Sequence, residues 1–201
     1  MSEQLGTPRM QTEALSALLV DRGHNYELAR AVCEACAAAG GSSWQQAVDA
    51  LVLVCDAHGC AVDFVWWVVQ DEVARTSTPT GLFRATTPAS RAVGVLFRTY
   101  GTVYLHTVLG RLVRDVAALS GNEDALIEVV ERALREDICT STNLLPTVLR
   151  DVLNRVRVAV AAKFAQSQLL SVSGFLFGRF LAPAVATPAS FSLLAQSPRP
   201  Q

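Results

Sequence analysis

Apolar residues recur three or four positions apart along nearly the whole 201-residue chain, and no segment alternates as a half-buried strand does. Glycine and proline separate these apolar runs, as they do at the ends of helices. The sequence therefore predicts an all-α fold, a helical bundle that follows a disordered N-terminus at 1–9. We expect an irregular, proline-containing C-terminal end and helices at about 10–21, 25–39, 44–59, 62–74, 89–119, 123–136, 144–165 and 169–181.

The composition is that of an apolar chain with little charge. Hydrophobic residues make up 51% and charged residues 17%, against about 25% charged in a typical domain, which excludes a disordered, charge-solvated chain. The net charge of −1 provides no field that attracts nucleic acid, so no nucleic-acid partner is expected. Residues 1–75 hold 4 basic and 10 acidic residues, whereas residues 76–201 hold 13 and 8. Sixteen of the 17 basic residues are arginine, which indicates either an acidic or phosphate-bearing partner or a bias in codon composition.

The five cysteines do not predict a metal site or a disulfide framework. Their number is odd, and no basic stretch followed by an apolar run marks a secretory leader, so reduced thiols in the cytoplasm are expected. Cys33-x-x-Cys36 has the spacing of zinc ligands, but Cys55 and Cys60 do not supply a matching second pair. Small cysteines in an alanine-rich helix explain the pattern better, and we expect no bound metal.

The apolar stretch 169–194 is long enough to span a membrane. Arg179 lies near its middle, at a cost of roughly 2.5–3.5 kcal/mol on insertion scales. Pro183 and Pro188 are expected to interrupt any single helix there. The stretch is therefore interpreted as a core helix followed by a loop, and no integral membrane segment is expected.

No phosphate-binding, dinucleotide-binding, zinc-protease or serine-hydrolase motif occurs in the chain, so a self-contained enzyme is not expected. The segment 76–90 is rich in Thr, Ser, Pro and Gly and predicts a loop. Arg84 lies in it directly after Leu82 and Phe83. An arginine held out by two apolar anchors can enter the site of another protein, and the alternative interpretation is a solvated loop arginine.

Four motifs in one order resemble a known family. "GLFRATTPAS" at 81–90, "FRTYGTVYLHTVLGRLVRDV" at 97–116, "LLPTVLRDVLNRV" at 144–156 and "SGFLFGRFLAPAV" at 173–185 are similar to motifs of the Ras GTPase-activating proteins. The resemblance extends over about residues 10–200. It implies a RasGAP-like helical domain whose finger loop occupies residues 78–90.

The resemblance implies roles for two arginines. Arg84 matches the arginine finger, which enters the nucleotide site of Ras and neutralises the charge that develops on the phosphates. Arg179 matches the arginine that bonds the backbone of the finger loop and supports it. Leu149 and Arg150 match a preceding family motif, and Phe175, Phe177, Pro183 and Ala184 match structural positions. Partner contacts are expected from Arg150, Gly178, Leu82, Phe83, Ala85 and Thr86.

The function implied is stimulation of GTP hydrolysis by a Ras-like small GTPase. The chain itself is then a GTPase activator and not an enzyme, because catalysis occurs on the partner. No cofactor belongs to the chain, since GTP and Mg²⁺ are bound by the GTPase. The expected location is the cytoplasm, and peripheral association with the inner face of the plasma membrane through flanking domains is compatible with this.

Three departures from the family pattern leave alternatives open. Gly178 replaces a leucine, Pro88 replaces a leucine at the loop exit, and the chain ends at Gln201 before further family helices. We therefore expect a domain that is incomplete at its C-terminus. The alternatives are a scaffold that binds a small GTPase without activating it, and an incomplete gene model.

Overall fold

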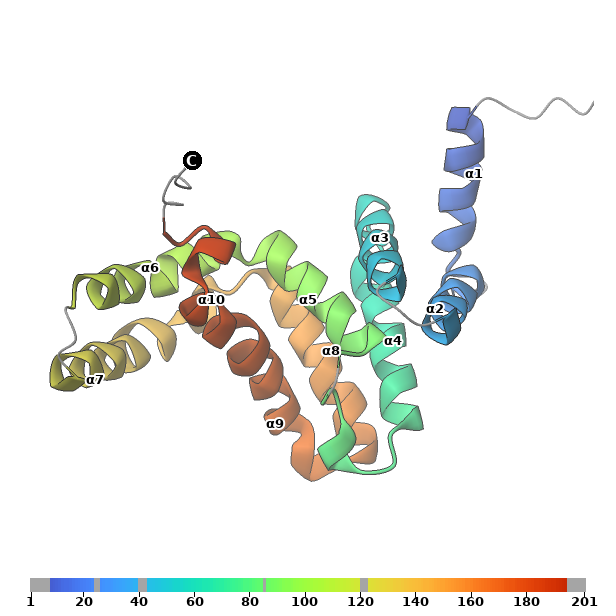
Figure 1. Ribbon diagram of the computed structural model, residues 1–201. Helices are drawn as coiled ribbons and strands as arrows, with labels where there is room; N and C mark the ends of the chain where they lie inside the picture. Colours follow the sequence, from blue (N-terminus) through green and yellow to red (C-terminus); the bar gives the residue numbers. More distant parts are fainter. Residues whose placement is uncertain (1–7, 24–25, 40–42, 85, 120–122, 195–201) are drawn as a thin grey trace, which may run out of the picture. The chain divides into compact units, whose positions relative to one another are not determined.

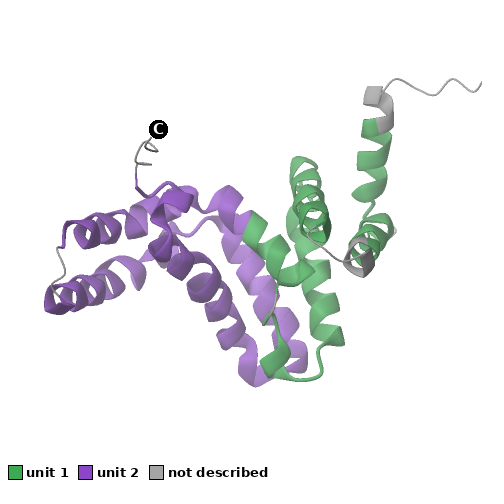
Figure 2. Cartoon of the chain, viewed as in Figure 1, with its two compact units in different colours: residues 1–95 green, residues 96–201 purple. Residues whose placement is uncertain are grey.

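The structure is a computed structural model that describes residues 8–23, 26–39, 43–84, 86–119 and 123–194. Helices account for most of these residues, and no strand occurs among them, so the all-α prediction is confirmed. The described chain divides into two compact units, Met1–Val95 and Leu96–Gln201 (Figure 2). That both form one domain over 10–200 stays a prediction, and residues 1–7 of the predicted disordered N-terminus lie outside the described residues.

The first unit is built around a helix with partners on both sides. Helix α3 packs against α2 and α4, and α1 contacts both α2 and α3 (Figure 1). Valines and Phe64 fill the interior because the apolar positions of α3 and α4 recur at helical spacing. The predicted boundaries agree with the observed ones to within three residues. The helices of this unit are α1 (Pro8–Leu19), α2 (Glu27–Ala39), α3 (Ser43–Ala57), α4 (Ala61–Arg75), the 3₁₀ turn η1 (Pro79–Gly81) and the first part of α5 (Pro88–Tyr100).

The second unit consists of packed helix pairs. Helices α6 and α7 lie side by side, as do α8 and α9 (Figure 1). Buried leucine, valine and phenylalanine side chains form its interior. Its elements are α6 (Thr102–Ala118), α7 (Glu123–Arg132), the π-helix η2 (Ala133–Ile138), η3 (Ser141–Leu144), α8 (Thr147–Lys163), η4 (Ala165–Ser167), α9 (Gln168–Ser173), the π-helix η5 (Gly174–Leu181), α10 (Ala182–Ala186) and η6 (Pro188–Phe191).

The prediction of one long helix over 89–119 is wrong. Helix α5 ends at Tyr100 and α6 begins at Thr102, with Gly101 between them. The ring of Phe180 lies directly over Gly101, and a Cβ added there would lie 2.3 Å from that ring. Phe180 also stacks on Phe97 with ring centroids 4.7 Å apart. An aromatic ring from η5 occupies the space that a side chain would need, so only glycine fits at this junction between the two helices.

The prediction that Pro183 ends the last helix is also wrong, because helical backbone continues to Ala186. Residues 174–181 form a π-helix, and the N–H of Ala182 donates to the carbonyl of Phe177. Pro183 then falls in the first turn of α10, where a missing N–H costs little. The stretch Ala165–Ala186 meets the length and hydropathy of a membrane span, and 22% of its 18-residue apolar window is buried. Length and composition alone do not distinguish a span from an apolar helix of a water-soluble protein, so the membrane prediction stays untested.

Tyr26 adopts an unusual conformation beneath α4. Its φ is 57°, its side chain is 4% exposed, and its ring meets Phe64 edge-on at 5.8 Å. Its hydroxyl has no hydrogen-bond partner among the described residues. Burial raises the pKa of Tyr26 to about 12.

Replacing Tyr26 with phenylalanine is expected to leave the free energy of unfolding at pH 7 unchanged or higher, because a buried unpaired hydroxyl costs about 1–3 kcal/mol. The wild-type chain should lose stability as the pH rises from 10 towards 12, since the unfolded chain ionises its tyrosine first. Tyr26→Phe should lose less over this range. Urea unfolding at several pH values measures both effects.

Tyr104→Phe is the matched control. Its hydroxyl is buried and lies 2.8 Å from the Ser141 hydroxyl, so its removal should cost about 1 kcal/mol. A greater loss of stability in Tyr26→Phe than in Tyr104→Phe would contradict the prediction.

Candidate partner-binding site

The finger loop reverses direction in a tight turn just before Arg84. Leu82 has φ −59° and ψ 125°, and Phe83 has φ 51°. The N–H of Arg84 faces the carbonyl of Gly81 at 3.5 Å. These angles describe a type II turn, in which the third residue needs a positive φ and is usually glycine. A phenylalanine there is strained by about 1–2 kcal/mol, so other contacts must hold it in place.

Two features anchor this turn to its own unit. The side chain of Phe83 is 6% exposed, whereas Arg84 next to it is exposed to solvent. Glu72, from the last turn of α4, accepts a hydrogen bond from the N–H of Phe83 at 2.9 Å and another from the hydroxyl of Thr87. One carboxylate therefore binds the loop on both sides of Arg84.

The loop leaves through a capped helix start. Thr87 accepts a hydrogen bond from the N–H of Ser90 at 3.1 Å, and the Ser90 hydroxyl accepts one from the N–H of Thr87 at 2.8 Å. This reciprocal pair satisfies donors that the first turn of a helix leaves open. Pro88 is the first residue of α5, a position that suits its fixed φ. The final residues of the finger loop, 88–90, are thus the first turn of α5.

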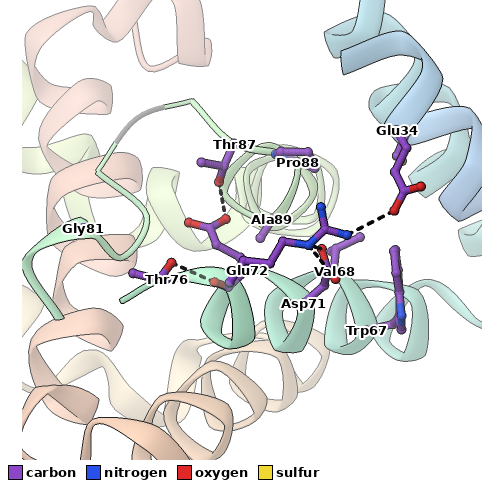
Figure 3. A pocket seen from close by; sticks show the side chains of 12 residues that line it. Glu34, Trp67, Val68, Asp71, Glu72, Thr76, Gly81, Thr87, Pro88 and Ala89 are labelled. Carbon is purple, nitrogen blue, oxygen red and sulfur yellow. Dashed lines mark hydrogen bonds and ion pairs between the residues drawn. The ribbon is translucent and has the colours of Figure 1, made fainter. Parts of the chain in front are cut away.

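A cavity of about 490 Å³ lies beside this anchor, between α2, α4 and the start of α5 (Figure 3). Trp67, Val68 and Ala89 form apolar parts of its wall. Arg75 lies across it and bonds Asp71 at 3.0 Å and Glu34 at 3.1 Å. These two carboxylates raise the pKa of the Arg75 guanidinium, Glu34 most of all.

The other predicted site residues lie in the second unit. Arg179, half-buried on η5, places its guanidinium 6.0 Å from the centre of the Phe175 ring. Gly178 is exposed, and a Cβ added there would meet nothing within 4 Å. Arg150, exposed on α8, donates to the hydroxyl of Thr147 at 3.1 Å. Phe177 is 45% exposed, so plain core packing does not explain it.

The structure leaves the site predictions untested. Arg84 and Arg179 belong to different units, so the support of the finger loop by Arg179 stays a prediction. Leu82 is half-buried and Thr86 is exposed, while Ala85 lies outside the described residues. The sequence analysis did not identify Glu72 as a site residue, and no motif marks it, because the backbone N–H that it binds lies eleven positions further along the chain.

The described residues contain no cluster of side chains suited to a metal ion. No three His, Cys, Asp or Glu side chains there lie close enough together to hold an ion. Cys33, Cys55 and Cys60 are buried, and the side chain of Cys36 lies outside the described residues. Burial raises the pKa of the Cys55 thiol, which keeps it protonated at neutral pH.

Comparisons with known proteins show that the chain is similar to Ras GTPase-activating proteins. Residues 116–201 match the family model described as GTPase-activator protein for Ras-like GTPase. The chain is 29% identical over 198 residues to the RasGAP-activating-like protein 1 of Mus musculus. This match covers 81% of the chain and 25% of the mouse protein. It is 27% identical over 178 residues to the Ras GTPase-activating protein 3 of Bos taurus. That match covers 78% of this chain and 21% of the relative. A probable Ras GTPase-activating-like protein, ngap, of Dictyostelium discoideum is 25% identical to it over 168 residues. That match covers 74% of this chain and 19% of the relative.

The predicted resemblance to the Ras GTPase-activating proteins is therefore confirmed. The family model includes Arg150, Gly178 and Arg179 but does not reach Arg84. A match over 81% of the chain extends further towards the N-terminus and has to include position 84. The chain spans about a quarter of the length of the curated relatives that it matches.

Proposed function

We propose that this chain stimulates GTP hydrolysis by a Ras-like small GTPase, with Arg84 as the arginine supplied to the partner. The observation that carries the proposal is the exposed Arg84 at the end of an anchored turn, in a chain similar to Ras GTPase-activating proteins. The names of its relatives support the general activity. The residue assignments rest on the resemblance of the motifs.

The chemistry of the loop fits this role. Phosphoryl transfer to water needs little covalent help from a protein, and it proceeds faster when positive charge stabilises the phosphate oxygens. A guanidinium is always charged and presents a planar fork of donors to those oxygens. The buried ring of Phe83 fixes the base of the loop, so Arg84 enters the partner's site with less conformational entropy to lose. GTP and Mg²⁺ are held by the partner in this proposal.

One observation favours a second candidate, a scaffold that binds a GTPase without activating it. Gly178 replaces the leucine of the family motif, and the space around it is open. A surface without that side chain buries less apolar area against a partner, at about 25 cal/mol per Å². A weaker contact between Gly178 and the partner would lower the fraction of complexes in which Arg84 reaches the nucleotide site.

Single-turnover GTP hydrolysis separates the two candidates. Several Ras-like GTPases are loaded with GTP and mixed with an excess of this chain, and phosphate release is followed against the GTPase alone. Binding of each GTP-loaded protein is measured separately by fluorescence anisotropy. Faster hydrolysis with one of them supports the activator, and binding without acceleration supports the scaffold. A chain that neither binds nor accelerates any of them would refute both.

A further inference from the structure

We propose that Glu72 is a positioning residue for Arg84: its carboxylate holds the type II turn that directs Arg84 out of the finger loop. This inference rests on the proposed function for its catalytic consequence. The structural part rests on contacts within the first unit alone. Glu72 itself is not placed at the reacting atoms.

The first step concerns the peptide between Leu82 and Phe83. Type I and type II turns differ by a flip of this central peptide, which reverses the direction of its N–H. The type I form needs no positive φ and suits phenylalanine better than the observed φ of 51° does. The turn observed is therefore the one that the local sequence disfavours.

The second step concerns what reverses that preference. The N–H that the flip would turn away is the N–H of Phe83, and it donates to the Glu72 carboxylate at 2.9 Å. A hydrogen bond to an ionised group is stronger than one between neutral groups, and it offsets the strain of a non-glycine residue at positive φ. The carboxylate thus selects the type II form.

The third step concerns the far side of the loop. The second carboxylate oxygen of Glu72 accepts from the Thr87 hydroxyl (Figure 3). Thr87 also caps α5 through Ser90, so this contact joins the loop exit to a fixed helix start. Only Arg84 and the two residues after it lie between the two points of attachment. These two contacts hold the chain at Phe83 and at Thr87, and they restrict the direction in which Arg84 leaves the loop.

The test compares Glu72→Ala with Asp71→Ala. The two residues are neighbours on α4 and both variants remove one carboxylate, but Asp71 bonds Arg75 and not the loop. Hydrogen exchange at the Phe83 amide, followed by NMR, measures how well the turn protects this N–H, and it needs no partner protein. We expect exchange at least tenfold faster in Glu72→Ala and unchanged in Asp71→Ala. Equal exchange in Glu72→Ala and wild type would overturn the inference.

The stimulated rate of GTP hydrolysis provides the second test. Glu72→Ala should lower the rate at saturating activator by about 10²-fold, as expected for a misplaced group, while the Kd for the GTPase changes less than about threefold. Asp71→Ala should match wild type. Glu72→Gln, which keeps an acceptor for the Phe83 N–H, should lie between wild type and Glu72→Ala.

A double variant distinguishes positioning from a general loss of structure. If Glu72 acts through Arg84, Glu72→Ala should have no further effect in a chain that already carries Arg84→Ala. An equal loss in both backgrounds would overturn the positioning role. A wild-type chain that accelerates no GTPase would refute the proposed function and the catalytic consequence, while the exchange result still decides whether Glu72 holds the turn.

Discussion

Replacing Arg84 with alanine is expected to lower the stimulated rate of GTP hydrolysis by about 10³-fold or more, equivalent to roughly 4 kcal/mol of transition-state stabilisation. The side chain is exposed, so its removal should leave the free energy of unfolding nearly unchanged. The affinity for the GTP-loaded partner should fall much less than the rate, because in the proposed role the guanidinium acts on charge that develops in the transition state. Single-turnover hydrolysis at saturating activator measures the rate, and anisotropy measures the affinity.

Two further variants make this result interpretable. Arg84→Lys keeps one positive charge but loses the planar fork, so it should recover only a small part of the lost rate. Arg135→Ala removes another exposed arginine, whose ion pair with Glu131 lies on the surface, and it should behave like wild type. The assignment of the finger to Arg84 fails if Arg84→Ala and Arg135→Ala accelerate hydrolysis equally.

Replacing Gly101 with alanine is expected to destabilise the chain by about 3 kcal/mol. An added Cβ would lie 2.3 Å from the Phe180 ring and 2.4 Å from the carbonyl oxygen of Phe97. Neither atom can move freely, because the two phenylalanine side chains are 1% exposed and stacked on each other. Either the ring stack or the junction between α5 and α6 has to shift. Urea unfolding followed by circular dichroism measures the loss.

Gly110→Ala is the control for this change. Gly110 is buried in α6, but the nearest atom to its added Cβ is the end of the flexible Arg114 side chain at 3.4 Å. Alanine is the better helix former by about 1 kcal/mol, so this variant should be as stable as wild type or more stable. A loss below about 1 kcal/mol in Gly101→Ala would contradict the close packing observed around Gly101.

The helical class and most helix positions could be predicted from local patterns. The first four helices were placed to within three residues because apolar spacing and glycine punctuation are local properties. The two errors have different origins. The junction between α5 and α6 lies at Gly101, where Phe180, far along the chain, occupies the space of a side chain. Helical backbone continues past Pro183 because a π-helix precedes it, which is a local feature of the backbone.

The candidate site divides in the same way. Arg84 was proposed from its place after two apolar residues in a polar loop and from the resemblance of that motif to the Ras GTPase-activating proteins, and its role stays a prediction. Its supporting residue Glu72 was not proposed, because the contact joins a side chain on α4 to a backbone N–H that no sequence pattern marks. The positive φ of Phe83 was equally hidden, since phenylalanine does not favour it.

The sequence by itself therefore determined the helical class, the positions of the first four helices and the polar loop that contains Arg84, all of which depend on neighbours a few positions apart. Only the tertiary structure decided where a long helix breaks and how the loop is held. Those features depend on groups that are distant in sequence and meet only after folding, the Phe180 ring against Gly101 and the Glu72 carboxylate against the turn.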